Sequence, residues 1–185
     1  GKDMSESKAN PRDNILDAAQ RVAGKEGAGN LTLDKVACEC GMSKGGLLYN
    51  FPNKDALLAG MLDRLLEQHK AMMDSEEKSL AGEPNACLKA MLGANACHEV
   101  ADPGVYLSLL AASAHKPELM TPVKETLAEY YQRLQNESSD PDMATILWLA
   151  AEGLIFHAIL GLAPYSQSEK NRLFQKLMQI SEEAL

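Results

Sequence analysis

The stretch of residues 31–54 constrains the fold most, because it contains two helix starts separated by a glycine turn. Thr32 and Ser43 are good N-cap residues, and each precedes a short segment whose apolar residues recur at helical spacing. Gly41 lies between the two segments, where a glycine can end the first helix. A proline stops the second segment, and Asn53 can cap the next helix. This is the pattern of a DNA-binding helix-turn-helix.

The second of these helices contains two successive glycines, Gly45 and Gly46. Each costs about 1 kcal/mol relative to alanine in a helix, so a helix built only to pack would not favour them. A helix whose backbone must approach another surface closely can use them. The positions expected to be exposed are Ser43, Lys44, Gly45, Gly46, Tyr49 and Asn50.

Several consecutive segments resemble the TetR-like (tetracycline-repressor-like) family of transcriptional regulators. The run from Ser43 to Leu57 is similar to the family signature. Ile15 to Ala19, in an alanine-rich helix that ends near Gly27, and Thr32 to Val36 match in order and spacing. The resemblance covers about residues 12–58 and implies that the helix beginning after Ser43 lies in the major groove. The DNA-facing residues that it implies are Ser43, Lys44, Gly45, Leu48, Tyr49 and Asn50.

Phosphate contacts are assigned to Thr32, Tyr49 and Lys54. Thr32 and Lys54 lie at expected helix N-termini, where backbone N–H groups and the helix dipole favour an anion. Tyr49 is expected to pack its ring against the head and to point its hydroxyl outward.

Base contacts are assigned to Lys44 and Asn50, because Lys suits guanine and Asn suits adenine, and Leu48 can touch a thymine methyl. The alternative for Leu48 is that it only packs the head. The helix departs from the family pattern at Leu48, where an aromatic residue is common, and at Asn50, where histidine is common.

The net charge of −8 is unevenly distributed along the chain. Residues 1–55 contain eight Lys or Arg and eight Asp or Glu, whereas residues 56–185 contain ten and eighteen. Phosphate contacts must therefore come from a few placed donors rather than from a basic patch. The four cysteines and the absence of a cleavable leader predict free thiols in a reducing cytoplasm.

The sequence contains no segment of β periodicity, so we predict an all-α protein of about nine helices. Three helices form a DNA-binding helix-turn-helix domain over residues 11–55, and six form a ligand-binding and dimerisation body over residues 56–185. Residues 1–10 are expected to be a disordered tail, in which residues 1–3 are a cloning remnant. The expected body helices cover 54–79, 84–100, 103–115, 118–134 and 141–162, and a last helix capped by Ser168 ends near Ala184.

The helix over residues 141–162 is apolar nearly all round, and a small monomer cannot easily bury it. Pairing it and the last helix with a second copy solves this, and the resemblance implies the same homodimer. The alternatives are a core helix of a monomer and a membrane span, but Glu152 and His157 interrupt the apolar stretch and argue against a membrane. The expected interface residues are Ile146, Ala150, Gly153, Leu154, His157, Ala158, Gly161, Leu173, Leu177 and Ile180.

The resemblance also implies a cavity in the body for a small, largely apolar effector. Met and aromatic side chains suit an adaptable pocket, although each is more often plain core. Glu152 is the most informative of them, because a buried carboxylate needs a partner: a cationic ligand, His157 or another residue of the chain. The candidate lining residues are Met61, Leu65, Met91, Leu92, Asn95, Leu109, Tyr130, Trp148, Glu152 and Phe156.

The resulting prediction is a repressor that binds a pseudo-palindromic DNA operator as a dimer and is released by a small molecule. One alternative is a regulator of the same fold that a protein partner switches. Another is a helical-bundle enzyme, but the sequence has no Glu-x-x-His pair, nucleophile elbow or phosphate loop. A third alternative is an activator, which has the same sequence features as a repressor. No catalytic residue, metal or cofactor is expected.

Overall fold

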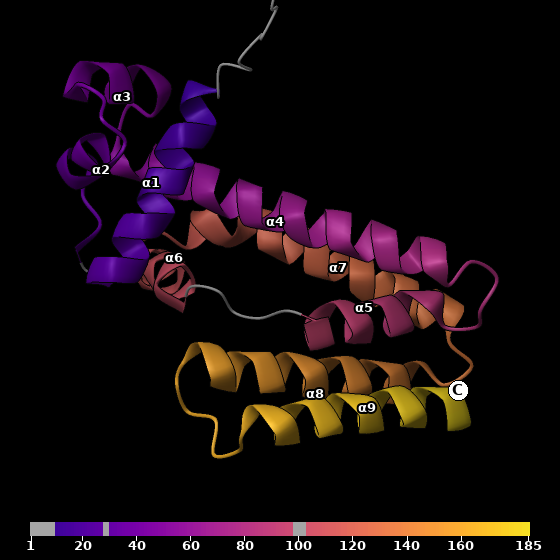
Figure 1. Cartoon of the computed structure of the whole chain (residues 1–185). Helices are drawn as coiled ribbons and strands as arrows, with labels where there is room; N and C mark the ends of the chain where they lie inside the picture. Colours follow the sequence, from indigo (N-terminus) through magenta and orange to yellow (C-terminus); the bar gives the residue numbers. More distant parts are fainter. Residues whose placement is uncertain (1–9, 28–29, 98–102) are drawn as a thin grey trace, which may run out of the picture. The chain divides into compact units, whose positions relative to one another are not determined.

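The computed structural model describes residues 10–27, 30–97 and 103–185 (Figure 1). These residues form nine α-helices, a short 3-10 helix that we call η2, and no strand, which confirms the all-α prediction. The expected tail lies almost wholly outside the described residues. Two compact units are present: a head unit of residues 1–63 and 104–116, and a body unit of residues 64–103 and 117–185.

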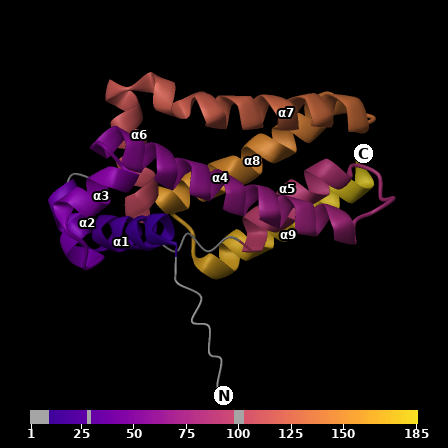
Figure 2. The ribbon, with the colours of Figure 1, turned by 90° about the horizontal axis from the view of Figure 1, so that it is seen from above.

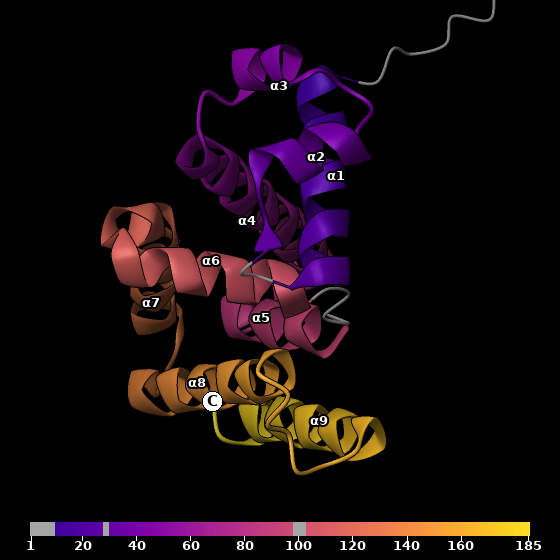
Figure 3. The same ribbon diagram turned by 90° about the vertical axis from the view of Figure 1, so that its left-hand side faces the viewer.

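In the head unit, α1 (Pro11–Glu26), α2 (Leu33–Glu39) and α3 (Lys44–Asn50) contact one another (Figure 3). The first turns of α4 (Lys54–Ser79) and most of α6 (Pro103–His115) complete the unit. Helix α1 packs through one small apolar face at i, i+3, i+4 and i+7 spacing. The buried residues of α1 are Ile15, Leu16, Ala18, Ala19, Val22 and Ala23.

Phe51 anchors the connection between α3 and α4, and its side chain is 0% exposed. The Arg12 guanidinium lies 4.3 Å from the ring centroid, a cation–π contact. Gly60 also lies against this ring, because a Cβ added there would be 2.7 Å from Phe51. An ion pair between Lys116 and Asp55 joins the end of α6 to the start of α4. The position of α3 is therefore fixed by packing at its C-terminal end.

In the body unit, α5 (Ala86–Cys97) contacts α7 (Thr121–Glu137), α8 (Pro141–Ile159) and α9 (Gln167–Glu183). Helices α8 and α9 lie side by side in Figures 1 and 3. One apolar core joins these helices to the second half of α4. Its buried residues are Met73, Cys87, Leu88, Ala90, Met91, Leu92, Ala94, Tyr130, Leu134, Ala144, Leu147, Trp148, Ala151, Ile155 and Phe174.

Two helix starts in the body differ from the sequence prediction. Helix α5 begins at Ala86 rather than at Pro84, because Asn85 adopts a left-handed φ of +55° and accepts the first helical hydrogen bond from Lys89. The helix predicted from Glu118 is divided into η2 (Pro117–Met120) and α7 (Figure 2). Pro122 has no N–H to donate to residue 118, which explains the break.

The last two helices also differ at their ends. Helix α8 ends at Ile159 instead of Leu162, because Gly161 takes a left-handed φ of +66° and the Leu162 N–H returns to the His157 carbonyl. Helix α9 is capped by Ser166, so the prediction of Ser168 is wrong. Ser166 and Glu169 form a capping box, a Ser-x-x-Glu signal that is visible in the sequence.

Candidate functional site

The helix-turn-helix is held by local hydrogen bonds at each helix start. The Thr32 hydroxyl accepts from the Lys35 N–H at 3.3 Å, and the Ser43 hydroxyl accepts from the Gly46 N–H at 3.1 Å. Gly41 has a φ of +68°, so it makes the turn between α2 and α3 as predicted. The Asn53 side chain caps α4 through the Ala56 N–H at 2.8 Å. Residues 32–56 therefore set their own helix ends.

Helix α3 presents a polar and glycine-rich face with one exposed ring. Tyr49 is 91% exposed, so the prediction that its ring packs against the head is wrong. Lys44 and Gly45 are exposed, and the Lys44 Nζ is 2.9 Å from an Asp34 carboxylate oxygen. Leu48 is half-buried, which leaves part of its side chain for another contact. Ser43, at the N-cap, is exposed as well.

The other predicted DNA-facing residues differ in how freely they can reach outward. Thr32 and Lys54 are exposed at the N-termini of α2 and α4. Asn50 is half-buried, and its amide nitrogen donates to the Gly46 carbonyl at 3.0 Å within the same helix. The backbone carbonyl of Asn50 accepts from Arg12 at 3.4 Å. One amide donor of Asn50 is thus used inside the head.

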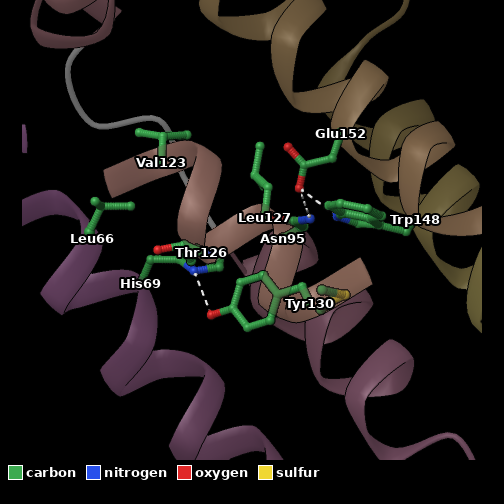
Figure 4. Close-up of a pocket in the computed structure, with 10 residues that line it drawn as sticks. Leu66, His69, Asn95, Val123, Thr126, Leu127, Tyr130, Trp148 and Glu152 are labelled. Carbon is green, nitrogen blue, oxygen red and sulfur yellow. Dashed lines mark hydrogen bonds between the residues drawn. The ribbon is translucent and has the colours of Figure 1, made fainter. Parts of the chain in front are cut away.

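A cavity of about 160 Å³ lies within the body unit, between α4, α5, α7 and α8 (Figure 4). It brings together Met91, Asn95, Tyr130, Trp148 and Glu152 from the predicted set. Among the other predicted residues, Leu92 and Leu65 belong to the same unit but do not line the cavity, and Phe156 is 50% exposed on α8. Met61 and Leu109 are buried residues of the head unit.

Five lining residues were missed by the sequence analysis: Leu66, His69, Val123, Thr126 and Leu127. On α7 the lining positions 123, 126, 127 and 130 follow i, i+3, i+4 and i+7 spacing, so they form one helix face. That periodicity was available in the sequence. What the sequence did not show is which neighbours this face would meet.

Hydrogen bonds hold the polar groups of the cavity in place. One oxygen of Glu152, Oε1, accepts from the Asn95 amide at 3.2 Å and from the Trp148 indole N–H at 3.3 Å. Across the cavity, the Tyr130 hydroxyl and the His69 Nδ1 are 3.4 Å apart (Figure 4). Burial raises the pKa of Tyr130 to about 12, so its phenol is neutral at pH 7. The carboxylate thus has partners from this chain, which was one of the three alternatives.

A second cavity, of about 340 Å³, lies between α4 and α7 of the same unit and shares Leu66, Thr126 and Tyr130 with the first. We call it the acidic groove, because its charged lining has five carboxylates and two basic groups: Glu67, Asp74, Glu77, Glu125, Glu129, Lys70 and Arg133. Arg133 binds Glu77 through two hydrogen bonds of 2.8 and 3.0 Å.

Helix α8 exposes a row of apolar residues on one side. Ile146 is 58% exposed and Leu149 is 57% exposed. All ten residues predicted for the dimer interface are exposed or half-buried in the single chain. Among the described residues, α8 is also the one helix that is long and apolar enough to cross a membrane by length and composition, and only 33% of that segment is buried. A core helix can pass the same test.

The described cysteines are free, and they differ in exposure. Cys38 is exposed, Cys40 is half-buried, and burial raises the pKa of Cys87 to about 12. Within the described ranges, no three His, Cys, Asp or Glu side chains lie together as a metal site would require. Because Cys87 is fully buried, we interpret it as an unreactive core thiol.

Comparison with known proteins agrees with the fold and the helix-turn-helix. Residues 85–182 match the family described as "Tetracyclin repressor-like, C-terminal domain", and residues 15–61 match "Bacterial regulatory proteins, tetR family". The chain belongs to the TetR family of helix-turn-helix transcriptional regulators. Members of this family are DNA-binding regulators and not a class of enzymes.

The chain is similar to the uncharacterized HTH-type transcriptional regulator YerO of Bacillus subtilis, at 26% identity over 144 residues, which is 77% of this chain and 48% of YerO. It is 31% identical over 81 residues to the HTH-type transcriptional regulator TtgR of Pseudomonas putida, which is 44% of this chain and 39% of TtgR. The matched segments therefore span about half the length of these relatives or less.

Solved structures share the fold at low sequence identity. A transcriptional regulator from Rhodococcus sp. Rha1 superposes with a TM-score of 0.73 at 21% identity, over 92% of this chain and 95% of that chain. The multidrug binding protein EbrR complexed with ethidium gives 0.55 at 24% identity, over 91% and 98%. EbrR has also been solved with malachite green, with a TM-score of 0.62 at 22% identity, over 90% of this chain and 96% of that chain.

Proposed function

We propose that this regulator is a homodimeric repressor that binds a pseudo-palindromic operator and is released by a small-molecule effector in the cytoplasm. Helix α3 reads the major groove, α8 and α9 form the dimer, and the cavity beside Trp148 and Glu152 binds the effector. The observation that carries the regulatory part is this cavity of about 160 Å³ in the body unit.

The glycines of α3 support a close approach to DNA. A Cβ at Gly45 would meet nothing within 4 Å in this protein, and one at Gly46 would make only ordinary contacts of 3.4 Å with Met42 and Ser43. The fold itself therefore requires neither glycine, although each lowers helix stability. A backbone that must lie close to a duplex explains their presence.

Phosphate and base contacts are proposed from the exposed positions. Lys54 and Thr32 contact phosphates at helix N-termini, and the Tyr49 hydroxyl reaches a further phosphate because its ring projects from the head. Lys44 and Leu48 contact base edges. The side chain of Asn50 has its amide oxygen and one amide hydrogen left for a base, because the other amide hydrogen is donated to the Gly46 carbonyl.

The dimer is proposed from the exposed apolar row on α8. A single head is too small for tight specific binding, because one such module buries roughly 600–1,000 Å². Two heads double this area and match a two-fold symmetric operator. Covering Ile146 and Leu149 with the same helix of a second copy also removes an exposed apolar surface that water does not favour.

The cavity favours a small-molecule effector over a protein partner as the switch. A volume of about 160 Å³ exceeds that of several water molecules, each of which occupies roughly 30 Å³ in the liquid. The EbrR structures with ethidium and malachite green show that a protein of this fold accommodates such molecules. A protein partner would need no such cavity, so the second alternative has less support.

Release follows from differential binding. An effector that prefers a DNA-incompetent conformation by ~100-fold supplies about 2.7 kcal/mol of coupling. Helix α4 is one continuous helix with residues in both units, so we propose that it transmits the change from the cavity to the head. The two heads of the dimer then no longer match successive major grooves.

Selection of bound sites from random DNA tests this function. The purified chain is expected to enrich a sequence with two-fold symmetry, and the protein–DNA complex is expected to contain two copies. The selection is then repeated with candidate effectors, and an effector that saturates the cavity is expected to lower operator affinity. A chain that stays monomeric and shows no preference over random duplex would contradict the proposal, as would saturating effector that leaves operator affinity unchanged.

A further inference from the structure

We infer that the effector is a small aromatic cation and that Glu152 is its counter-ion. This inference rests on the proposed effector cavity and adds the charge of the ligand. The two oxygens of the Glu152 carboxylate are unequally hydrogen-bonded. Its Oε1 accepts two hydrogen bonds, from Asn95 and from Trp148.

Both donors to Glu152 are neutral, and the carboxylate has no cationic partner from the described part of the chain. Neither Lys nor Arg occurs among the ten residues that line the cavity, and its one histidine, His69, lies against Tyr130. Hydrogen bonds from neutral groups orient a carboxylate without neutralising its charge. A half-buried negative charge that faces an otherwise largely apolar cavity is stabilised by a ligand that brings a positive charge.

The rest of the cavity wall suits an aromatic cation. Trp148 and Tyr130 supply rings whose faces attract a cation, and Met91, Leu66 and Leu127 supply apolar contacts. The volume of about 160 Å³ is close to that of the engineered cavity of ~150 Å³ that binds benzene, so one aromatic ring with small substituents fits. A larger dye would have to extend into the acidic groove.

The acidic groove gives a second, independent reason. It adjoins the cavity through Leu66, Thr126 and Tyr130, and its lining has five carboxylates against two basic groups. Arg133 is paired with Glu77, which leaves four carboxylates of the groove against one lysine. The negative charge of the acidic groove raises the local concentration of cations and repels anions, so the groove favours the same ligand charge as Glu152 does.

The test compares phenyltrimethylammonium with tert-butylbenzene, its neutral isostere, by isothermal titration calorimetry on the full chain. The fluorescence of Trp148, the single tryptophan, provides a second measurement of binding in the cavity. The cation is expected to bind at least roughly tenfold more tightly than the neutral compound. Glu152→Gln keeps an oxygen that accepts from Asn95 and Trp148 but removes the charge, so it is expected to abolish this preference.

Glu182→Gln is the matched control, because it makes the same change in net charge at an exposed position of α9 outside the cavity lining. It is expected to leave the preference unchanged. Tighter or equal binding of tert-butylbenzene to the unsubstituted chain would overturn the inference, and this comparison needs no variant to fold. A preference that survives in folded Glu152→Gln would overturn it too.

The two levels of the proposal fail differently. Suppose that the cation binds, that its binding depends on Glu152, and that operator affinity does not change. This result would contradict release by an effector, but it would support the assigned charge of the ligand. Binding of the neutral compound with loss of operator affinity would keep the regulatory function and overturn the charge. If neither compound binds, the cavity is not an effector site for ligands of this size, and the inference falls with it.

Discussion

The head and the body of this chain build their functional surfaces in different ways. The head surface comes from consecutive residues whose helix ends are set by their own side chains, as at Thr32 and Ser43. The cavity of the body takes residues from four helices, so that Leu66 and Glu152 meet only through folding. A helix-turn-helix surface can therefore be set by interactions among near neighbours in the sequence, whereas a cavity depends on the packing of helices that are distant in the sequence.

The exposed surfaces of the two units differ, because α3 exposes polar groups and glycines whereas α8 exposes apolar groups, where we propose that a second copy binds. Ile146→Asp is expected to weaken dimerisation by at least about 100-fold, because two carboxylates would be desolvated at one interface. Sedimentation velocity measures the change. Gln132→Asp, at an exposed position on α7, is the control, and an unaltered dimer in Ile146→Asp would place the interface elsewhere.

Two glycines differ in the space around them, one in each unit. Gly60→Ala places a Cβ 2.7 Å from the Phe51 ring, so it is expected to lower the free energy of unfolding by about 1–3 kcal/mol. Gly153→Ala meets nothing within 4 Å, so it is expected to stabilise a single chain by up to about 1 kcal/mol.

Urea denaturation monitored by circular dichroism gives the change for each glycine variant. If Gly153 lies in the dimer interface, as proposed, Gly153→Ala also raises the dissociation constant of the dimer. Equal stabilisation by both substitutions would show that Phe51 does not constrain the start of α4.

Two substitutions in the head separate charge from sequence reading. Lys54→Ala is expected to weaken binding to all duplexes and to reduce the slope of log affinity against log salt by about one unit. Asn50→Ala is expected to relax preference at one operator position without changing that slope. Fluorescence anisotropy over a salt series measures both. An unaltered sequence preference in Asn50→Ala would limit Asn50 to its internal hydrogen bond with Gly46.

The smallest effect concerns the local cap of α9, which resembles the caps of the head. Hydrogen bonds from the Ser166 backbone and hydroxyl hold the pKa of Glu169 below its ordinary value of 4.5. Because the folded state favours the ionised carboxylate, the cap stabilises the protein above that value and loses its effect as the pH falls through the lowered pKa. Glu169→Gln is expected to lower Tm slightly at pH 7 but not at about pH 2. An equal decrease at both values would exclude ionisation as the cause.

Local signals predicted most of the helices. The predicted caps at Thr32, Ser43 and Asn53 are all present, because each side chain accepts a hydrogen bond from a backbone N–H three positions further along the chain. The start of α9 was misplaced although Ser166 and Glu169 form a recognisable capping box, so the sequence did contain the signal for the correct start.

The candidate cavity was predicted only in part. Glu152, Trp148 and Asn95 were among the predicted lining residues, and the structure brings all three together. Met61 and Leu109 were predicted to line the cavity as well but lie in the head unit. A helical period identifies which side of a helix is apolar, but it does not identify the helix that will cover that side.

The helical class, the helix-turn-helix and the family could be predicted from the sequence, because these depend on caps, turns and spacing among near neighbours. The tertiary structure alone decided that the α7 face from Val123 to Tyr130 meets Glu152 and that an acidic groove adjoins their cavity. The physical reason is that apolar burial is non-directional and is satisfied by many partners, so only the packed chain selects one of them.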